Sequence, residues 1–382
     1  MLQYWYITPL FIKASTMTDQ KYMNLAINLA NATLGQTSPN PCVGAVIVKN
    51  GAVIAYGAHL KSGDAHAEVN AINSTTPDNL VNSDLYITLE PCCHSGKTNP
   101  CTELIIKSKI KRVVVATLDP NPLVSGKGIK QLRDAGIEVV TGIMEQEAIE
   151  LNKMFFYYIS TKIPYITLKT GMSLDAKLAT SSNESKWITN EESRKDTHNY
   201  RHTHDAILVG INTIIADNPS LTTRLKNGGK HPIRIVLDTH LRTPANSKIA
   251  NDNISKTIII TGNQVTEKNK LQFTQKNVEI ISMPTPEIDI ADLLKILGNN
   301  NITSILVEGG QIIHNSFLQQ KLFNQLVIYI APILIGGGNA LNFFTGTGFE
   351  KLSKAVKLKI TEIKQLDGDI KIVAEQNTLG TI

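Results

Sequence analysis

A short cysteine-rich segment constrains this chain more than any other feature. Three of its four cysteines lie within residues 91–101, which read PCCHSGKTNPC and also contain a histidine. The glycine and the two prolines disfavour a regular helix, so the segment is expected to be a loop. Its thiols are disulfide partners, buried small side chains or metal ligands. Four cysteines in 382 residues do not make a disulfide scaffold, and such usage is more typical of metal binding or catalysis.

A second motif, HAE, favours the interpretation of these thiols as metal ligands. It contains His66 and Glu68, and the order H-x-E followed by P-C is typical of zinc-dependent deaminases. Zinc prefers four ligands drawn from Cys and His, and a catalytic site leaves one position for water. Adjacent Cys92 and Cys93 would have difficulty binding one tetrahedral ion, whereas Cys101 approaches from the next predicted helix. We therefore predict His66, Cys92 and Cys101 as the zinc ligands. Cys93 and Cys42 are predicted to be buried or spare thiols.

This ligand set leaves Glu68 free to transfer protons. Zinc lowers the pKa of bound water toward ~7, and a nearby carboxylate can carry the water's proton to departing ammonia. The motifs therefore predict hydrolytic deamination of an amidine-type carbon, with Glu68 as the catalytic residue. Because residues two apart in a helix point about 200° away from each other, His66 and Glu68 can share one site only from the first turn of the helix expected at 66–73.

Other interpretations of the cysteine-rich loop stay open. His94 would make the zinc site structural if it were a fourth protein ligand, and the thiols would otherwise pack without metal. A nucleic-acid-modifying deaminase is a further alternative. It would want a basic, aromatic-bearing groove, and no cluster of Lys and Arg lies near either motif.

Length and composition indicate an ordinary globular protein with two domains. A chain of 382 residues exceeds what one hydrophobic core usually supports, and its 42% hydrophobic and 19% charged residues are typical values. The net charge of +5 is spread along the chain and favours an anionic ligand over a nucleic acid. No apolar run reaches the ~20 residues that span a bilayer. Residues 1–17 are interpreted as an N-terminal extension.

Apolar runs alternate with helical patterns, which predicts an α/β protein with mixed or largely parallel sheets. The first domain is predicted at 18–148, a junction at 149–164 and the second domain at 165–382. Helices of the first domain are expected near 66–73, from Cys101 and at 127–136. Strands are expected in both domains, at 42–48, 52–57, 84–90, 112–118, 137–140, 165–171, 205–210, 233–238, 257–262, 304–310 and 326–338.

Longer motifs reveal a family resemblance. The segments SPNPCVGAVIV, GAHLKSGDAHAEVNAI, PCCHSGKTNPC and DPNPLVSGKGIKQLRDAGIEV resemble the deaminase domain of the bifunctional riboflavin-biosynthesis deaminase–reductases. LKTGMSLDAKLAT, ESKWIT, GINTIIADNPSLTTR, PIRIVLD and VEGG resemble that family's reductase domain. The resemblance runs from about residue 18 almost to the C-terminus, and it implies a cytidine-deaminase-like zinc domain followed by a dihydrofolate-reductase-like domain.

The resemblance also implies two activities, with Zn²⁺ and NADPH as cofactors. The first domain would deaminate 2,5-diamino-6-(5-phosphoribosylamino)pyrimidin-4(3H)-one, and the second would reduce the product's ribosyl group to ribityl. The expected partners are small phosphorylated pyrimidines rather than nucleic acids or membranes. A cytoplasmic homo-oligomer is expected.

Matching positions give the expected contacts. In the deaminase domain, residues that would hold the pyrimidine or its phosphate are Asn40, His59, His94 and Lys97. In the reductase domain, the nucleotide contacts would be Gly171, Trp187, Thr213, Asp217, Thr239, Gly310, Gln311, Ile312, Ile313, His314, Asn315 and Ser316. The substrate contacts there would be Ser185, Arg201, Leu221, Arg224 and Glu308.

The residues of the second half support part of this assignment by themselves. No G-x-G-x-x-G follows its first strand, so a Rossmann site is not indicated. Gly309 and Gly310 follow a strand and precede a helix, where backbone N–H groups can bind a pyrophosphate; a plain tight turn is the alternative. Arg201 and Arg224 would suit a phosphate clamp, or would be two solvated arginines.

Two further positions carry weaker expectations. Lys169 or Asp175 would assist the proton transfers that open the ribose ring. Ala176 stands where glycine is commoner in the family, and an ordinary negative φ is expected there.

Overall fold

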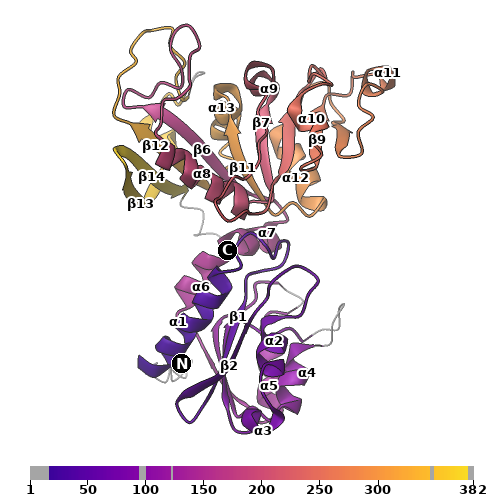
Figure 1. The fold of residues 1–382 in the computed structure, drawn as a ribbon, viewed down its shortest axis with the longest axis vertical. Coiled ribbons are helices and arrows are strands. Elements are labelled where there is room, and N and C mark those ends of the chain that lie inside the picture. Colours follow the sequence, from indigo (N-terminus) through magenta and orange to yellow (C-terminus); the bar gives the residue numbers. More distant parts are fainter. Residues whose placement is uncertain (1–16, 94–99, 122–123, 345–347, 377–382) are drawn as a thin grey trace, which may run out of the picture. The chain divides into compact units, whose positions relative to one another are not determined.

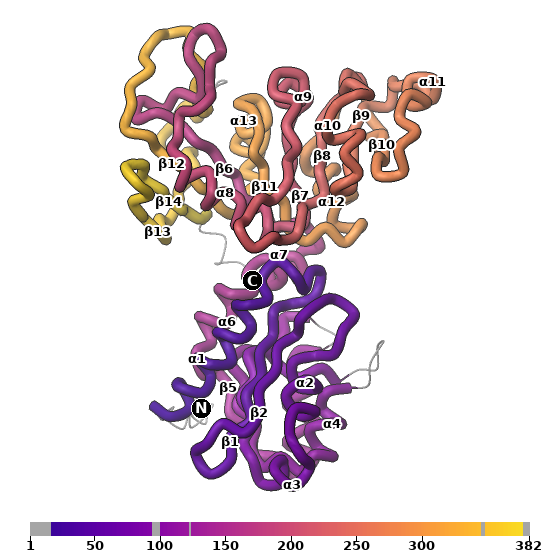
Figure 2. The backbone as a smooth tube through the Cα atoms, in the orientation of Figure 1, coloured from indigo at the N-terminus to yellow at the C-terminus, as the bar shows by residue number. Residues whose placement is uncertain are grey.

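The computed structural model describes residues 17–93, 100–121, 124–344 and 348–376. The chain divides into two compact units, Met1–Ser160 and Thr161–Ile382. Figures 1 and 2 show that each unit has its own sheet with helices packed on it. Much of the predicted junction, 149–164, is helical. Among the described residues, no helix combines the length and the apolar character that crossing a bilayer would require.

The first unit is built on a mixed sheet. Its described strands run in the order β2-β1-β3-β4-β5, with β1 antiparallel to β2 and β3, and with β3, β4 and β5 parallel. The strands are β1 (Gly44–Lys49), β2 (Ala52–Ala58), β3 (Asp84–Leu89), β4 (Arg112–Thr117) and β5 (Glu138–Thr141). The helices are α1 (Met17–Asn31), α2 (Ala67–Asn73), α3 (Pro77–Leu80), α4 (Cys101–Lys107), α5 (Lys127–Asp134), α6 (Glu145–Leu151) and α7 (Lys153–Thr161).

Both faces of this sheet are buried, which explains why its central strands are continuous apolar runs. Successive side chains of a strand point to opposite faces. Ala45 and Ile47 of β1 join a core formed with α2, α4 and α5, whereas Val46 and Val48 join a second core formed with α1 and α6. Figure 2 shows α1 and α6 on one side of the sheet and α2 and α4 on the other.

The second unit contains a larger, mainly parallel sheet. Its described strands run in the order β10-β9-β8-β7-β11-β6-β12-β14-β13, and all neighbours are parallel except the pairs β12/β14 and β14/β13. The strands are β6 (Tyr165–Ser173), β7 (Ala206–Gly210), β8 (Ile233–Leu237), β9 (Thr257–Thr261), β10 (Val278–Ser282), β11 (Ser304–Gly309), β12 (Gln325–Ala331), β13 (Leu358–Leu366) and β14 (Asp369–Gln376).

Helices also cover both faces of this sheet. Alternate residues of its parallel strands pack with α12 and Phe317 of α13, and the others pack with α9 and α10. Tyr200 of α8 packs on β12 and β14. The helices are α8 (Glu191–Thr203), α9 (Ile211–Asp217), α10 (Lys248–Asn251), α11 (Glu267–Lys270), α12 (Ile290–Asn299), α13 (Gln311–Gln319) and the 3₁₀ helix η1 (Leu352–Lys354).

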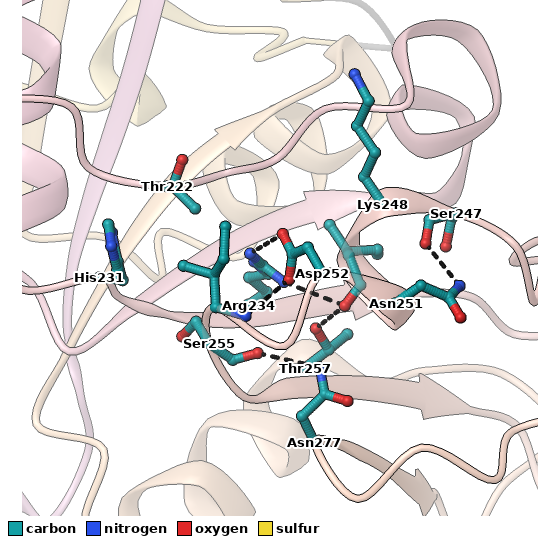
Figure 3. Close-up of polar contacts among 12 residues, drawn as sticks. Thr222, His231, Arg234, Ser247, Lys248, Asn251, Asp252, Ser255, Thr257 and Asn277 are labelled. Atoms are coloured by element: carbon teal, nitrogen blue, oxygen red, sulfur yellow. Dashed lines mark hydrogen bonds and ion pairs between the residues drawn. The ribbon is translucent and has the colours of Figure 1, made fainter.

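A fully buried arginine ties the α10 region to the sheet. Arg234 of β8 has no exposed surface, and its guanidinium donates to both carboxylate oxygens of Asp252 at 2.8 and 2.6 Å. It also donates to the carbonyl oxygen of Ile249, which accepts a hydrogen bond from Thr257 of β9 as well. Figure 3 shows these groups converging from two strands and the α10 segment. The buried charge is therefore paired, as burial requires, and its role is structural.

The α/β prediction is confirmed, with three differences of detail. Strands β10, β13 and β14 were not predicted, and β12 ends at Ala331 rather than extending to 338, because proline follows. Ala176 has φ +63°, so the expectation of an ordinary φ was wrong. Its N–H donates to Ser173 and its carbonyl accepts from Phe343, and this turn holds alanine in a conformation that glycine adopts more easily.

Candidate active sites

The three predicted zinc ligands come together in the first unit. His66 is the N-cap residue of α2 and has an extended backbone, Cys101 begins α4, and Cys92 follows β3. His66 therefore lies at the helix start that the sequence required. The His66 Nδ1 atom is 3.3 Å from Cys101 Sγ and 3.6 Å from Cys92 Sγ, and the three donor atoms lie within 4.8 Å of one another.

This donor set fits zinc. Tetrahedral bonds of ~2.05 Å to nitrogen and ~2.3 Å to sulfur place the two donors about 3.6 Å apart, which agrees with the distances seen. A hydrogen bond from Cys101, opposed by burial and assisted by His66, lowers the pKa of Cys92 to about 4. The same hydrogen bond raises the pKa of Cys101. A thiolate in this position is the form that binds metal.

Glu68 lies beside this donor set without belonging to it. It is the second residue of α2, and its side chain is buried. Burial raises its pKa to about 7, although its own backbone N–H opposes the shift. A carboxyl group with a pKa near neutrality can both accept and release a proton under physiological conditions.

Two of the predicted pyrimidine contacts lie next to the metal donors. His59 is buried, and its ring is 5.5 Å from that of His66. Its Nδ1 atom is 3.1 Å from the carbonyl oxygen of Ala65, which can only accept, so Nδ1 carries the proton. Nε2 then accepts from the Asn40 amide at 3.2 Å. His94 and Lys97, the other two predicted contacts, lie outside the described residues.

The two remaining thiols are outside the donor set. Cys42 is buried, with its Sγ 3.3 Å from Thr37 Oγ1, and Cys93 is partly exposed. Both were expected to be spare.

A buried carboxylate next to this loop was not predicted. Glu90 directly precedes Pro91, and its two oxygens accept hydrogen bonds from four backbone N–H groups at 2.9 to 3.3 Å, those of Asp119, Gly126, Gly128 and Ile129. At Gly128 an added Cβ atom would lie 2.2 Å from the carbonyl oxygen of Pro91, so only glycine fits. Glu90 thereby fastens the cysteine loop to the start of α5. Its one sequence signal was its place directly before P-C.

The second unit has a cavity of about 590 Å³ beside the carboxyl ends of β6 and β11. In open α/β sheets, ligands bind at this edge. Of the predicted contacts, the cavity is lined by Gly171, Ser185, Trp187, Arg201, Arg224 and Glu308. The remaining lining residues are Lys169, Leu178, Ile188, Thr189, Glu191, Arg194, Lys195, Thr197 and His198.

An ion cluster lies at the cavity wall. Arg201 Nε and Nη2 donate to the two carboxylate oxygens of Glu308 at 2.6 and 2.9 Å, and Nη1 donates to the Thr222 carbonyl at 3.0 Å. Lys169 Nζ is 3.9 Å from Glu308. Burial opposes ionisation of Glu308, but the charges of Arg201 and Lys169 outweigh it and lower its pKa to about 2. Arg201 is thus fixed by Glu308 rather than solvated.

The other predicted nucleotide contacts lie on or near α9, β8 and α13. Thr213 and Asp217 belong to α9, Thr239 follows β8, and Gly310 caps α13. Gly310 has φ +56°, and an added Cβ atom would meet only Thr213 Oγ1, at 3.8 Å. The backbone here is therefore open to close approach, which fits a nucleotide pyrophosphate at the start of a nine-residue helix.

Side chains among these contacts have varied surroundings. Asp217 forms an ion pair with Lys186 at 2.7 Å. Trp187, the next residue along the chain, is exposed, and its ring centre lies 4.6 Å from the Arg194 guanidinium. Leu221 is buried. The His314 imidazole is also buried, 3.3 Å from the carbonyl oxygen of Val307, so only its backbone is left for the predicted contact.

Sequence reasoning missed one face of α8. Glu191, Arg194, Lys195 and His198 line the cavity together with Arg201. Steps of three or four residues lead from Glu191, through Arg194 or Lys195 and then His198, to the predicted Arg201, which places these residues on one face of the helix. That spacing was the available signal.

Comparisons with known proteins identify the family of each half of the chain. Residues 164–372 match the family model of the RibD C-terminal domain, and residues 16–117 match that of the cytidine and deoxycytidylate deaminase zinc-binding region. The riboflavin biosynthesis protein RibD of Bacillus amyloliquefaciens is 49% identical over 358 residues, covering 93% of this chain and 96% of that protein. The Actinobacillus pleuropneumoniae protein of the same name is 44% identical, covering 93% and 94%.

Solved structures of similar proteins have the same fold. Acinetobacter baumannii RibD is 36% identical with a TM-score of 0.85, covering 94% of this chain and 99% of that one. A Thermotoga maritima diaminohydroxyphosphoribosylaminopyrimidine deaminase/5-amino-6-(5-phosphoribosylamino)uracil reductase is 35% identical with the same TM-score and coverage. The predicted family, the two activities and the cofactors Zn²⁺ and NADPH are thereby confirmed. The chain belongs to the RibD family of bifunctional riboflavin-biosynthesis enzymes, which join a zinc-dependent deaminase to an NADPH-dependent reductase.

Proposed function

We propose that His66, Cys92 and Cys101 hold the zinc ion and that Glu68 is the proton carrier of the deaminase. The observation that carries this assignment is the geometry: three donors at metal-binding distances and a buried carboxyl group beside them. Bound zinc supplies Lewis acidity that lowers the pKa of water toward ~7. Glu68 accepts a proton from that water and delivers it to the departing 2-amino group, so water and the diaminopyrimidine give the pyrimidinedione and ammonia.

Asn40 and His59 complete the proposed pyrimidine site. Their mutual hydrogen bond orients the Asn40 amide, and the bond to Ala65 fixes the His59 ring. Both are held before substrate arrives, which reduces the entropy lost on binding. His94 and Lys97 are proposed from the family resemblance alone.

Glu68→Gln tests the deaminase assignment. The variant should keep stoichiometric zinc, because Glu68 is not a ligand, and should lose ammonia release by at least ~10²-fold. Metal analysis and an ammonia assay on the same preparation separate the two roles. Loss of zinc together with activity would make Glu68 a ligand, and normal ammonia release would refute its proton-carrying role.

For the reductase we propose that the 590 Å³ cavity binds the phosphorylated product of the first step. Its lining contains more cations than carboxylates: Lys169, Arg194, Lys195, Arg201 and Arg224 against Glu191 and Glu308. This balance suits a phosphate. Arg224 is proposed as the main phosphate ligand, since Arg201 is already paired with Glu308, and Ser185 also lines the cavity.

The protein's part in hydride transfer is positional. NADPH supplies the hydride when bound, and Gly310, Thr213, Trp187 and their neighbours are proposed to hold it against the sugar. Lys169 is the better candidate for opening the ribose ring, because it lines the cavity 3.9 Å from Glu308 and burial lowers its pKa. Asp175 instead accepts three hydrogen bonds, from Ser173, Ile335 and Gly336, and stays ionised.

Arg224→Ala tests the reductase assignment. It should raise KM for the deaminated substrate and reduce NADPH oxidation, while ammonia release from the first substrate stays normal. Arg201→Ala is a less clean test, because it would leave Glu308 buried without its partner. Unchanged NADPH oxidation in Arg224→Ala would place the phosphate elsewhere.

We also propose that the chain forms a cytoplasmic homo-oligomer through β13 and β14. Ile360, Ile363 and Ile370 expose 56%, 67% and 40% of their surfaces. In this antiparallel pair, Ile360 is opposite Ala374 and Ile363 is opposite Ile372, so the apolar side chains share one face of the sheet. Small phosphorylated pyrimidines, rather than nucleic acids, remain the proposed partners.

A further inference from the structure

His198 stands out among the groups that line the reductase cavity. It lies in the middle of α8, one turn from Arg194 and one turn from Arg201, and all three line the cavity. Only 8% of its surface is exposed. None of the contacts expected from the sequence involved it.

Its hydrogen bonds are incomplete. Nδ1 of His198 is fully buried and, within the described residues, has no hydrogen-bond partner. His204 at the end of the same helix differs: its Nδ1 is 2.8 Å from the Tyr200 carbonyl, and its Nε2 is 2.9 Å from Thr167 Oγ1. Buried polar atoms in native proteins are almost always satisfied, by protein, water or ligand. A buried imidazole at a ligand cavity that is otherwise rich in ion pairs therefore points to a ligand.

The charges around His198 indicate which ligand group it suits. The charged groups that act on it are Arg201, Arg224, Lys169 and Glu308. Burial and the two arginines lower its pKa to about 4, so the ring is neutral near pH 7. A neutral imidazole offers one donor and one acceptor. A hydroxyl group also donates and accepts, whereas a phosphate dianion only accepts and is better served by arginine.

We propose that His198 is a specificity-determining residue of the reductase, binding a hydroxyl group of the substrate's ribosyl chain. The inference rests on the proposed function of the cavity. It assigns the uncharged middle of the substrate to α8, between the phosphate at Arg224 and the reacting carbon near Lys169 and Glu308.

The test compares His198→Phe, which keeps a ring but no hydrogen-bonding atoms, with His198→Gln, which keeps one donor and one acceptor. We expect kcat/KM for the ribosylated substrate to fall about tenfold in His198→Phe, the loss of roughly one hydrogen bond. KM for NADPH should stay unchanged. His198→Gln should recover most of the loss.

Equilibrium binding supplies a readout that does not depend on turnover. Calorimetric titration with the ribityl product, without NADPH, should show weaker binding by about the same factor in His198→Phe and near-normal binding in His198→Gln. Ammonia release by the same preparations serves as the internal control for folding of the chain, and thermal unfolding reports on the reductase unit. If phenylalanine prevents folding, His198→Leu replaces it.

The outcomes distinguish the role of His198 from the proposed function of the cavity. Wild-type affinity for the ribityl product in His198→Phe or His198→Leu, or a change confined to KM for NADPH, would overturn the role of His198. So would failure of His198→Gln to recover binding in a folded protein. Absence of NADPH oxidation by the wild-type chain with the ribosylated substrate would instead refute the proposed function of the cavity.

Discussion

Two buried glutamates show how neighbours decide the chemistry of one residue type. Glu68 and Glu308 are both enclosed, yet the pKa of Glu68 rises to about 7 and that of Glu308 falls to about 2. Burial dominates at Glu68, whereas at Glu308 the cations Arg201 and Lys169 overcome it. The first carboxyl group is poised to move protons and the second to hold a fixed negative charge. The sequence nominated both residues but could not distinguish their charge states.

The adjacent cysteines provide a test at the same scale. Cys93→Ser should retain one zinc per chain, whereas Cys92→Ser and Cys101→Ser should lose it, because only the latter two sulfurs approach the His66 nitrogen. Metal analysis after gel filtration measures this, and Cys42→Ser is a buried control outside the donor set. Retention of zinc by Cys101→Ser would show that a different ligand set is used.

Glu308 makes stability depend on pH. Its folded-state pKa is about 2, below the ordinary value of 4.5, so between these values the unfolded chain binds more protons than the folded one. The pair with Arg201 therefore contributes its full stability above about pH 4.5, and this is lost as the pH falls toward 2. At neutral pH, Glu308→Gln should lower the free energy of unfolding by about 3–5 kcal/mol, because Arg201 is left buried and unpaired.

Urea titrations between pH 3 and pH 7 check this dependence. The difference in free energy of unfolding between wild type and Glu308→Gln should be largest above pH 4.5 and should become smaller as the pH is lowered. A difference that stays constant across this range would mean that Glu308 does not carry the charge assigned to it. Glu184→Gln, at an exposed position of the same unit, is the matched control.

At the scale of elements, the sequence predicted those segments whose pattern directly reports burial. The β1 run is apolar throughout because both faces are covered, and α2 and α4 start where His66 and Cys101 were expected. By contrast, β13 and β14 mix Lys, Glu and Gln with Ile, because β13 lies at the sheet edge and is largely exposed. A strand of that kind has no distinctive pattern in a single sequence.

Prediction of the residues that line the cavity from the sequence was limited in a similar way. Arg201, Arg224 and Glu308 were nominated by family motifs, but the rest of the α8 face depends on which side of the helix meets the sheet. That orientation follows from tertiary contacts such as Tyr200 against β12 and β14, which the sequence alone does not reveal. His198 was missed for this reason.

A prediction at the scale of elements concerns Glu90, which lies between β3 and Cys92 and whose carboxylate accepts hydrogen bonds from the start of α5. Glu90→Gln would replace one acceptor oxygen by an amide group that faces N–H donors, leaving donors unsatisfied at about 1–3 kcal/mol each. We expect a lower unfolding temperature and weaker zinc retention under chelator challenge. Glu103→Gln, an exposed substitution on α4, should change neither. Equal behaviour of the two variants would show that the Glu90 contacts do not hold the loop.

At the scale of the whole molecule, the two units have similar α/β architectures but carry different kinds of site. In each unit the central strands of the sheet are buried on both faces. The first unit brings together the proposed zinc ligands at two helix starts and the end of β3, and the second brings cations to a cavity beside the carboxyl ends of parallel strands. The products of the first reaction keep the phosphate that the second cavity is suited to bind, so a single anionic group can serve recognition in both steps.

The exposed face of β13 and β14 gives the prediction for assembly. Isolated apolar side chains are common on protein surfaces, but Ile360, Ile363 and Ile370 share one face beside an unpaired sheet edge within the described residues, and such surfaces are typical of interfaces. Sedimentation velocity should find an oligomer in the wild type and a monomer in Ile363→Glu. Lys364→Glu, one residue along and on the opposite face of the strand, should leave the oligomer intact. A wild-type monomer, or an oligomer that survives Ile363→Glu, would place the interface elsewhere or remove it.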